Sequence, residues 1–404
     1  QIRISLPTER IADILKPNKV NISYRENELE KAVKNPVNSP DIENFLGNTR
    51  KILIIVNDTT RPTPTALILD CIFPFIKDRE ITILVATGIH EPTSDEQNKI
   101  ILGKYYNLFS QRLICHNSKR SRMRDIGYSK NNTHLLINEL VFEYEKIIVT
   151  GSVEPHYFAG YTGGRKAFMP GVAAYESIEQ NHMFAMRPKS RLLALDGNPV
   201  HDDMVDALNV VKNHCKIFSI MTVLDEKHSI YAAAAGCLEG AFKTAVSRCQ
   251  DVYCVKCRDK ADVVVAICTY PMDANLYQSQ KALESGKLIL KKNGIIILVS
   301  QCGHGIGEGE FANILRSSSC AHEIIDKFES NYILGAHKAV RIAELSTWAN
   351  IWCVTNLPGN DLHGLFMTPK QNLQRTVDEA LHKSGNHAKV SFLFSASTTV
   401  PLIG

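Results

Sequence analysis

Three apolar segments, each followed at once by a polar loop, place the strongest constraint on what this chain can fold into. Lys51–Val56, Ile81–Ala86 and Lys146–Thr150 are rich in Ile and Val and show no sustained alternation of polar and apolar residues. Such nearly continuous apolar strands are typical of a parallel sheet that helices cover on both faces. The helical pattern of Ala66–Ile76 completes a strand–loop–helix unit. The sequence therefore predicts an α/β fold with mostly parallel sheets.

A second α/β unit is predicted to open near Ala261, and a helix is predicted to start near Asn275. The length of 404 residues suggests two or three domains. Between the two units, Ala232–Lys256 is rich in alanine and predicts a helix with its exit. The later predicted strands again combine apolar and β-branched residues, and they are Lys216–Leu224, Asp262–Cys268, Gly294–Ser300 and Lys389–Ser395.

Polar side chains follow all three of the first predicted strands. Asp58 and Arg61 come after the first strand, His90 after the second and His156 after the third. Ligands bind beyond the carboxyl ends of parallel strands, so we expect these side chains to converge on one site. The alternative is a structural role for Asp58 or Thr60 as the N-cap of the following helix, with Pro62 in its first turn. Both roles can hold together, because a helix N-terminus also binds anions.

The stretch from Gly151 to His182 is rich in Gly and Pro and follows the third strand. Its glycines allow positive φ angles and let the backbone approach a ligand closely. Lys166 is followed by Ala167, so the stretch does not match the phosphate-binding loop of P-loop NTPases. The composition predicts a site that wraps a flat anionic ligand, and a structural loop with incidental histidines is the alternative. The side chains that project from this stretch are His156, Arg165, Lys166 and His182.

Charge and cysteine content argue against several classes of protein. The net charge is +4 with acidic and basic residues interleaved, which does not suggest a nucleic-acid partner. No apolar run approaches the 18 residues of a membrane span, and the first residues do not resemble a signal peptide. The eleven cysteines are scattered without a disulfide framework, which favours the reducing cytoplasm. A single C-x-x-C, Cys254 and Cys257, lacks a second pair for zinc.

Several short motifs together resemble the lactate racemase family, whose enzymes depend on a nickel-pincer nucleotide. The most specific block is E-P-H-Y-F-A-G-Y-T-G-G-R-K at 154–166, and the likeness spans most of the chain. The other matching pieces are N-D-T-T-R-P at 57–62, T-G-I-H at 87–90, P-G at 170–171, N-H at 181–182, D-A-N-L-Y-Q-S-Q-K at 273–281 and G-H-G at 303–305.

The resemblance implies a role for each matching residue. Lys166 would carry the cofactor, Ni(II)-pyridinium-3,5-bisthiocarboxylic acid mononucleotide, through a covalent bond, and His182 would be the protein ligand of the nickel. His90 and His156 would be the acid/base pair, and neutral imidazole suits that task near pH 7. The remaining implied cofactor- or substrate-binding residues are Asp58, Thr59, Thr60, Arg61, Gln278 and Lys281.

The resemblance also implies an architecture and a reaction. It implies an N-terminal cofactor-binding domain over residues 1–258, to which segment 388–404 returns. A C-terminal domain over 259–387 would complete an active site in the interdomain cleft. The reaction would be racemisation or epimerisation of a 2-hydroxy acid by hydride abstraction and return. The expected partners are this substrate and the proteins that make and load the cofactor, while the oligomeric state stays open.

Two departures from the family pattern bear on the substrate. Glu91 stands where an arginine follows the first histidine in the family, and Arg165 stands where alanine precedes the tethering lysine. One cation is thus lost near His90 and one is gained near Lys166, which argues against lactate itself. A bulkier or more polar 2-hydroxy acid, including a sugar acid epimerised at C2, is an equally good candidate. Arg165 should also disfavour the ammonium form of Lys166, which would help the amine to become acylated.

Two other functions were weighed against the racemase. A zinc-type hydrolase could use His90, His156 and His182 as a three-histidine metal site. That function would leave Lys166 and the glycines without a role. A non-catalytic protein that stores or senses the nickel nucleotide is the third possibility, although it would not need both acid/base histidines.

Overall fold

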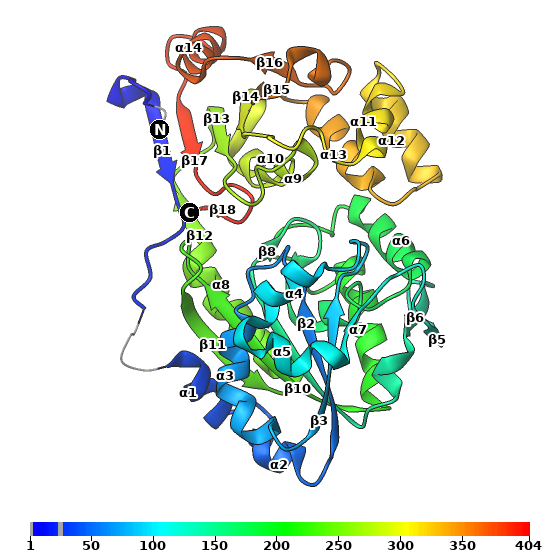
Figure 1. Cartoon of the computed structure of the whole chain (residues 1–404). Helices are drawn as coiled ribbons and strands as arrows, with labels where there is room; N and C mark the ends of the chain where they lie inside the picture. The colour runs from blue at the N-terminus through cyan, green and yellow to red at the C-terminus, as the bar shows by residue number, and fades with distance from the viewer. Residues whose placement is uncertain (1–2, 23–26) are drawn as a thin grey trace. The chain divides into compact units, whose positions relative to one another are not determined.

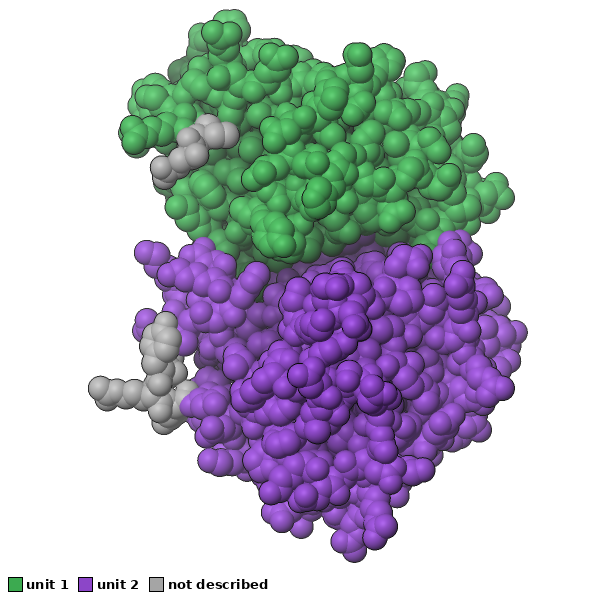
Figure 2. All heavy atoms as spheres, in the orientation of Figure 1, with its two compact units in different colours: residues 1–18, 253–404 green, residues 19–252 purple. Residues whose placement is uncertain are grey.

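The computed structural model describes residues 3–22 and 27–404, which form two compact units. One unit is Lys19–Val252, and the other joins the N-terminal residues up to Asn18 with Tyr253–Gly404 (Figure 2). Each unit contains a six-stranded sheet accompanied by helices (Figure 1). The α/β fold with two domains and mostly parallel sheets is therefore confirmed. Among the described residues, no helix has both the length and the apolar character to cross a membrane.

The sheet of the Lys19–Val252 unit has the strand order β11-β10-β7-β2-β3-β4. All neighbouring strands are parallel except β10 and β11. The three strands expected first, β2, β7 and β3, lie side by side in the middle of this sheet. The strand bounds are β2 (Lys51–Asn57), β3 (Glu80–Ala86), β4 (Leu113–Cys115), β7 (Lys146–Ser152), β10 (Lys216–Leu224) and β11 (Ile230–Gly236).

Strand β2 shows why these segments are continuously apolar. Ile52, Ile54 and Val56 pack into a core with α1, α2 and α3, while Leu53 and Ile55 point to the opposite face. All five side chains are fully buried, so both faces of the strand are covered.

The helices of this unit are α1 (Glu28–Lys34), α2 (Ile42–Leu46), α3 (Thr65–Ile76), α4 (Asp95–Leu102), α5 (Tyr106–Phe109), α6 (Tyr175–Met183), α7 (Pro199–Lys212) and α8 (Leu238–Tyr253).

Two small hairpins are added to this unit. β5 (Met123–Tyr128) and β6 (His134–Asn138) form an antiparallel pair, and residues 129–133 form the turn between them. β8 (Pro155–His156) and β9 (Gly160–Tyr161) form a second pair inside the glycine-rich stretch.

The sheet of the other unit has the order β1-β17-β13-β14-β15-β16 and is parallel throughout. A separate parallel pair joins β12 (Cys254–Cys257) to β18 (Val400–Ile403). The sheet strands are β1 (Ile11–Leu15), β13 (Ala261–Ile267), β14 (Leu290–Val299), β15 (Asn350–Val354), β16 (Thr368–Lys370) and β17 (Val390–Leu393). The helices are α9 (Leu276–Ser279), α10 (Lys281–Gly286), α11 (Gly309–Arg316), α12 (Ala321–Ser330), α13 (Ala336–Ser346) and α14 (Leu373–Ser384).

The division of the chain differs from the expected domains in two segments, because residues up to Asn18 and the segment 388–404 both belong to the unit that contains Tyr253. The structure divides the chain between Val252 and Tyr253, close to the expected end at 258. However, the segment 388–404 does not return to the N-terminal unit, because β17 pairs with both β13 and β1. Figure 1 shows the blue β1 beside the red β17. β1 and β17 therefore belong to the same sheet, while β18 pairs with β12 beside it in the chain's second unit.

The alanine-rich segment was predicted as one helix from Ala232 and is not. Residues Ala232–Ala235 belong to β11, which pairs antiparallel with β10, and the helix α8 begins only at Leu238. Alanine favours helix on its own, but its small side chain also fits a strand beside a closely packed backbone. Gly236 meets such a backbone, because an added Cβ there would lie 2.4 Å from the carbonyl oxygen of Val37.

Candidate functional site

The carboxyl ends of β2, β3 and β7 release three loops at one edge of the sheet. These loops carry Asp58, His90 and His156, as the strand pattern predicted. The 3-10 turn Gly164–Ala167, which holds Lys166, contacts both β2 and β7. The loop after β3 is tied to the same region, because the Gly88 N–H donates to the Gly171 carbonyl over 3.0 Å. The predicted residues of this unit are thus gathered at one edge.

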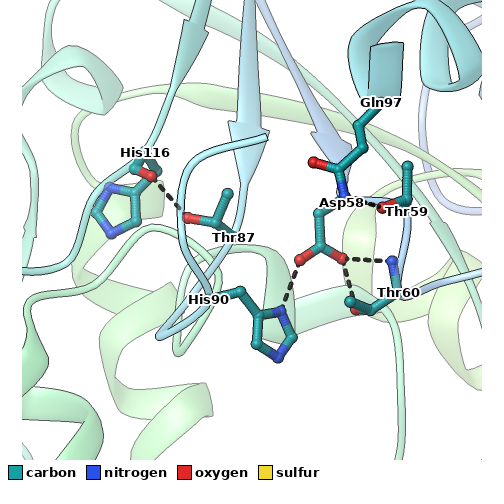
Figure 3. A network of polar contacts seen from close by, with 7 residues as sticks. All are labelled: Asp58, Thr59, Thr60, Thr87, His90, Gln97 and His116. Atoms are coloured by element: carbon teal, nitrogen blue, oxygen red, sulfur yellow. Dashed lines mark hydrogen bonds and ion pairs between the residues drawn. The ribbon is translucent and has the colours of Figure 1, made fainter. Parts of the chain in front are cut away.

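His90 and Asp58 form a histidine–carboxylate pair (Figure 3). The His90 Nδ1 lies 2.7 Å from Asp58 Oδ2, and the Asp58 side chain is 6% exposed while that of His90 is 44% exposed. The other oxygen, Oδ1, accepts from the Thr60 N–H at 3.1 Å and the Thr60 hydroxyl at 2.6 Å. An ionised carboxylate only accepts hydrogen bonds, so the Nδ1 of neutral His90 carries the proton. The Nε2 lone pair is then available as a base.

The charge state of Asp58 follows from its neighbours. Burial alone would raise the pKa of the Asp58 carboxyl. The hydrogen bond and charge of His90, the Thr60 hydroxyl and the Arg61 charge outweigh burial and hold the pKa below its usual range. The capping alternative for Asp58 is wrong, because α3 begins at Thr65 and has Pro64 at its N-cap without a side-chain bond.

Two further hydrogen bonds hold the loops after β2 and β3 (Figure 3). The Gln97 amide donates to the Thr59 hydroxyl over 3.3 Å, and the Thr87 hydroxyl donates to the His116 carbonyl over 2.7 Å. The His116 ring is fully buried between Asn138 and the Ala173 carbonyl, and burial lowers its pKa to about 4. His116 therefore supports the loops as a neutral ring, a role that no sequence motif indicated.

Phe158 brings together the other three predicted residues. Its ring centroid lies 4.6 Å from that of His156 and 5.0 Å from that of His182, both in edge-to-face orientation. The Lys166 ammonium lies 5.6 Å from the same centroid. Phe158 is 3% exposed, so it forms a rigid apolar support beneath the two imidazoles and the amine. Sequence analysis did not assign Phe158 any role.

His156 and His182 each have one ring nitrogen held by a neighbour. The Ala159 N–H donates to His156 Nδ1 over 3.2 Å, which leaves the proton of the neutral ring on Nε2. His182 Nδ1 lies 3.2 Å from the Asn181 side-chain oxygen. Both histidines are buried. His156 thus has the hydrogen-bond pattern opposite to that of His90.

Arg165 does not face the site, although it precedes Lys166. It is 1% exposed, donates to the carbonyls of Ala159 and Gly163, and lies 4.6 Å from the centre of the Phe242 ring. Burial lowers its pKa to about 9, so it remains charged at neutral pH. Arg165 braces the glycine-rich loop from inside and is not available to contact a substrate. Its presence therefore gives no reason to exclude lactate.

Gln278 and Lys281 belong to the other unit, so their membership of the site stays a prediction. The helix α9 starts as expected, because the Asn275 side chain caps it by accepting from the Gln278 N–H over 2.9 Å. The Gln278 side-chain oxygen is buried and has no hydrogen-bond partner among the residues that the structure describes. The Lys281 ammonium lies 3.4 Å from the Met272 sulfur.

The donor atoms suit an organic group that brings its own metal ligands. In residues 3–22 and 27–404, no three His, Cys, Asp or Glu side chains are grouped so that they could hold a metal ion. The site instead offers the Lys166 amine and the buried His182 imidazole beside the Phe158 ring. The imidazoles of His90 and His156 complete the set. A square-planar nickel that needs a single protein ligand is compatible with this set.

Comparison with known proteins gives one consistent result. The family described as the lactate racemase N-terminal domain matches residues 1–192, and the lactate racemase C-terminal domain matches residues 255–398. The lactate racemase of Thermoanaerobacterium thermosaccharolyticum is 29% identical over 97% of this chain and 95% of its own length. The lactate racemase of Lactiplantibacillus plantarum is 32% identical over 90% of this chain and 88% of its own length.

Solved structures agree with these matches. The structure of the lactate racemase apoprotein from T. thermosaccharolyticum superposes with a TM-score of 0.91 at 28% identity, covering 99% of this chain and 97% of that one. A crystal structure of a Thermotoga maritima protein gives a TM-score of 0.71 at 17% identity over 93% of this chain and 96% of that one. The second match concerns the fold alone.

Proposed function

The chain belongs to the lactate racemase family, and we propose that it inverts C2 of a 2-hydroxy acid with a nickel-pincer nucleotide tethered to Lys166. The observation that carries the proposal is the grouping of Lys166, His156 and His182 around the Phe158 ring. Lys166 would hold the cofactor and His182 the nickel. When bound, this cofactor would supply the acceptor and donor of the C2 hydride.

His90 is suited to take the substrate hydroxyl proton. Its Nε2 carries the lone pair, because Nδ1 donates to the Asp58 carboxylate. Asp58 would also stabilise the imidazolium that forms when His90 accepts the proton. Such positioned acid–base groups are worth about 10²–10⁴ in rate.

His156 is suited to the complementary role of proton donor. In the neutral ring the proton is on Nε2, since Nδ1 accepts from the Ala159 N–H. The ring would donate that proton as an imidazolium, protonated at Nδ1 as well, because loss of a proton from the neutral ring would leave an imidazolate. In the reverse reaction the two rings would exchange roles, with His90 as imidazolium donating its Nε2 proton. The pair can therefore serve both enantiomers, and the Asp58 carboxylate holds the Nδ1 of His90 in both directions of the reaction.

The substrate carboxylate needs a cation in the same region. Arg61 lies three residues after Asp58, is half-buried and acts on the Asp58 charge. A guanidinium can hold a carboxylate through two parallel hydrogen bonds. We assign this role to Arg61, with Lys281 as the second candidate, and Thr59, Thr60 and Gln278 as further contacts of cofactor or substrate. Glu91 is exposed, so lactate and a larger 2-hydroxy acid both remain candidate substrates.

The setting of the reaction is proposed on similar grounds. All eleven cysteines are free thiols in the structure, which suits a reducing cytoplasm. Cofactor-making proteins would be the partners that load Lys166.

The decisive experiment combines mass spectrometry with a racemisation screen. The chain is co-expressed with the cofactor-making proteins and assayed on enantiopure 2-hydroxy acids. Intact mass should show an adduct that is absent from Lys166→Ala and present in Lys189→Ala, an exposed lysine of the same unit. His182→Ala should keep the adduct and lose nickel.

The outcomes also separate the alternatives. An adduct without any racemisation across the screen would favour the storage or sensing protein. Activity that depends on zinc, with no adduct on Lys166, would favour the hydrolase. An adduct that survives Lys166→Ala would remove this lysine as the tether.

A further inference from the structure

Asn181 lies between the proposed nickel ligand and a buried carboxylate. Its side-chain oxygen is 3.2 Å from His182 Nδ1, and its amide nitrogen donates to the Val200 carbonyl at 3.0 Å and Asp203 Oδ2 at 3.5 Å. Asn181 and Asp203 are both fully buried. Asn181 and His182 come from α6, whereas Val200 and Asp203 come from α7.

These contacts fix the orientation of the Asn181 amide. A backbone carbonyl and a carboxylate can only accept hydrogen bonds, so the NH₂ group must face Val200 and Asp203. The amide oxygen therefore faces His182, and it too can only accept. The proton between the two residues must then be carried by His182 Nδ1, and the lone pair of the neutral imidazole is placed on Nε2.

Asp203 is itself held firmly by the turn between β5 and β6. One oxygen accepts from the Ser129 hydroxyl and the Asn131 amide, each at 2.8 Å, and the other accepts from the Thr133 hydroxyl. Three donors from one turn leave the carboxylate little freedom to rotate. The orientation of Asn181 thus rests on a network that joins α6, α7 and the β5–β6 turn.

We propose that Asn181, anchored by Asp203, is a positioning residue that sets the Nδ1–H tautomer of His182 and so presents Nε2 to the nickel. Metal-binding histidines generally donate their second nitrogen to a fixed acceptor, which orients the ring and selects the ligating nitrogen. The nickel half of this inference rests on the proposed function. The tautomer half concerns the chain alone.

The tautomer can be measured on the full chain without cofactor. In long-range ¹H–¹⁵N spectra of ¹⁵N-histidine-labelled protein, protonated and unprotonated ring nitrogens have distinct shifts, and His182→Gln identifies the resonance. We expect a protonated Nδ1 and an unprotonated Nε2 in the wild type. A wild-type His182 with the proton on Nε2 overturns the proposal, and the variant is needed only to assign the resonance.

Asn181→Leu tests whether Asn181 is the cause. The variant should lose the single tautomer, whereas Gln180→Leu should keep it. Gln180 is the matched control because it is a half-buried amide on the same helix whose oxygen accepts from the His134 N–H over 2.8 Å. An unchanged His182 tautomer in Asn181→Leu would show that Asn181 does not set it.

Nickel retention gives the second readout on cofactor-loaded protein. Loss of a residue that supports a metal ligand costs about 10–100-fold in metal affinity. Asn181→Leu should therefore release nickel to EDTA at a concentration about 10–100-fold lower than the wild type requires, with the Lys166 adduct intact. Equal retention overturns the nickel half. If wild-type His182 shows the expected tautomer but the loaded protein binds no nickel, both the nickel half of the inference and the proposed function are overturned.

Discussion

His90 and His156 are the same residue type at neighbouring strand ends, but the structure makes them chemically different. His90 donates from Nδ1 to a carboxylate, and His156 accepts at Nδ1 from a backbone N–H. Sequence analysis could place both at the edge of the sheet, because each follows a predicted strand. It could not assign their tautomers, since these depend on partners brought in by the local turn. The same limit applies to Arg165, whose inward orientation no motif encodes.

The two-histidine arrangement predicts how each variant fails. His90→Ala and His156→Ala should each lower racemisation in both directions by about 10²–10⁴, since every turnover needs an acid and a base. In a single turnover of each pure enantiomer, His90→Ala should consume one enantiomer and not the other, and His156→Ala should show the opposite preference. Equal loss with both enantiomers in both variants would contradict the two-base arrangement. Asp58→Asn should follow the pattern of His90→Ala more weakly. Asp125→Asn, which changes an exposed carboxylate paired with His134, should match wild type.

At the scale of elements, the glycine-rich stretch depends on one very close contact. Gly160 in β9 has φ +76°, and a Cβ built there would lie 2.1 Å from the Ala194 carbonyl oxygen. The sequence indicated unusual backbone conformations in this stretch. It could not indicate which glycine meets another segment, because the 190–198 loop is distant in the sequence.

Gly160→Ala should therefore destabilise the protein more than a positive φ alone requires. Gly197→Ala is the matched control, because Gly197 has φ +71° and meets nothing closer than 3.8 Å. We expect the control to cost about 1–2 kcal/mol for the left-handed backbone. Gly160→Ala should cost about 1–3 kcal/mol more, because the clash forces the two segments apart. Chemical denaturation of the two variants gives this difference. If both variants lose the same folding free energy, the 190–198 loop moves away from the new methyl group without a measurable energetic cost.

The helices α10 and α13 are joined by a buried ion pair. Glu284 is 3% exposed, pairs with Arg341, and has Lys287 at 2.8 Å. Burial would raise the pKa of the Glu284 carboxyl, but the charges of Arg341 and Lys287 and their hydrogen bonds lower it below 4.5. Nothing in the sequence marked this pair, because its partners are 57 residues apart.

Glu284→Gln should cost about 3–5 kcal/mol of folding free energy near pH 7, because it removes the buried carboxylate that pairs with the Arg341 guanidinium. The folded-state pKa of Glu284 is depressed, so its contribution is present above pH 4.5 and is lost as the pH falls through the lower folded value. The difference in free energy of unfolding between wild type and Glu284→Gln, measured by urea titration, should thus become smaller below pH 4.5. Glu379→Gln, which breaks an exposed pair with Lys370, should cost no more than about 1 kcal/mol. A gap that stays constant down to pH 3 would contradict the assigned charge state.

At the scale of the whole molecule, the sequence predicted two α/β units but misplaced the chain ends. Lys389–Ser395 was correctly predicted as a strand, yet the partner of a strand is set by pairing that local patterns do not encode. The structure places β17 between β13 and β1, so β1 and β17, which are far apart in the sequence, complete one sheet. Residues up to Asn18 thus belong with a unit that otherwise begins at Tyr253.

This topology predicts that deletion of residues 1–15 weakens the C-terminal unit selectively. β1 is an edge strand, and it is anchored by Arg10, which donates to the Gly385 carbonyl at 3.2 Å, and by Asp13, which pairs with Arg258 at 2.9 Å. Its loss exposes the edge of β17, so amide hydrogen exchange should accelerate there and in β13, with little change in β2 or β7.

Deletion of residues 1–3 is the matched control, because it keeps β1. It should leave exchange in β17 at the wild-type rate. If the longer deletion instead accelerates exchange in β2 and β7 as much as in β17, the two units unfold as one. The N-terminal strand would then contribute to the stability of the entire molecule and not of one sheet. Racemase activity lost in proportion to exchange in β17 alone would show that the reaction needs an intact C-terminal unit.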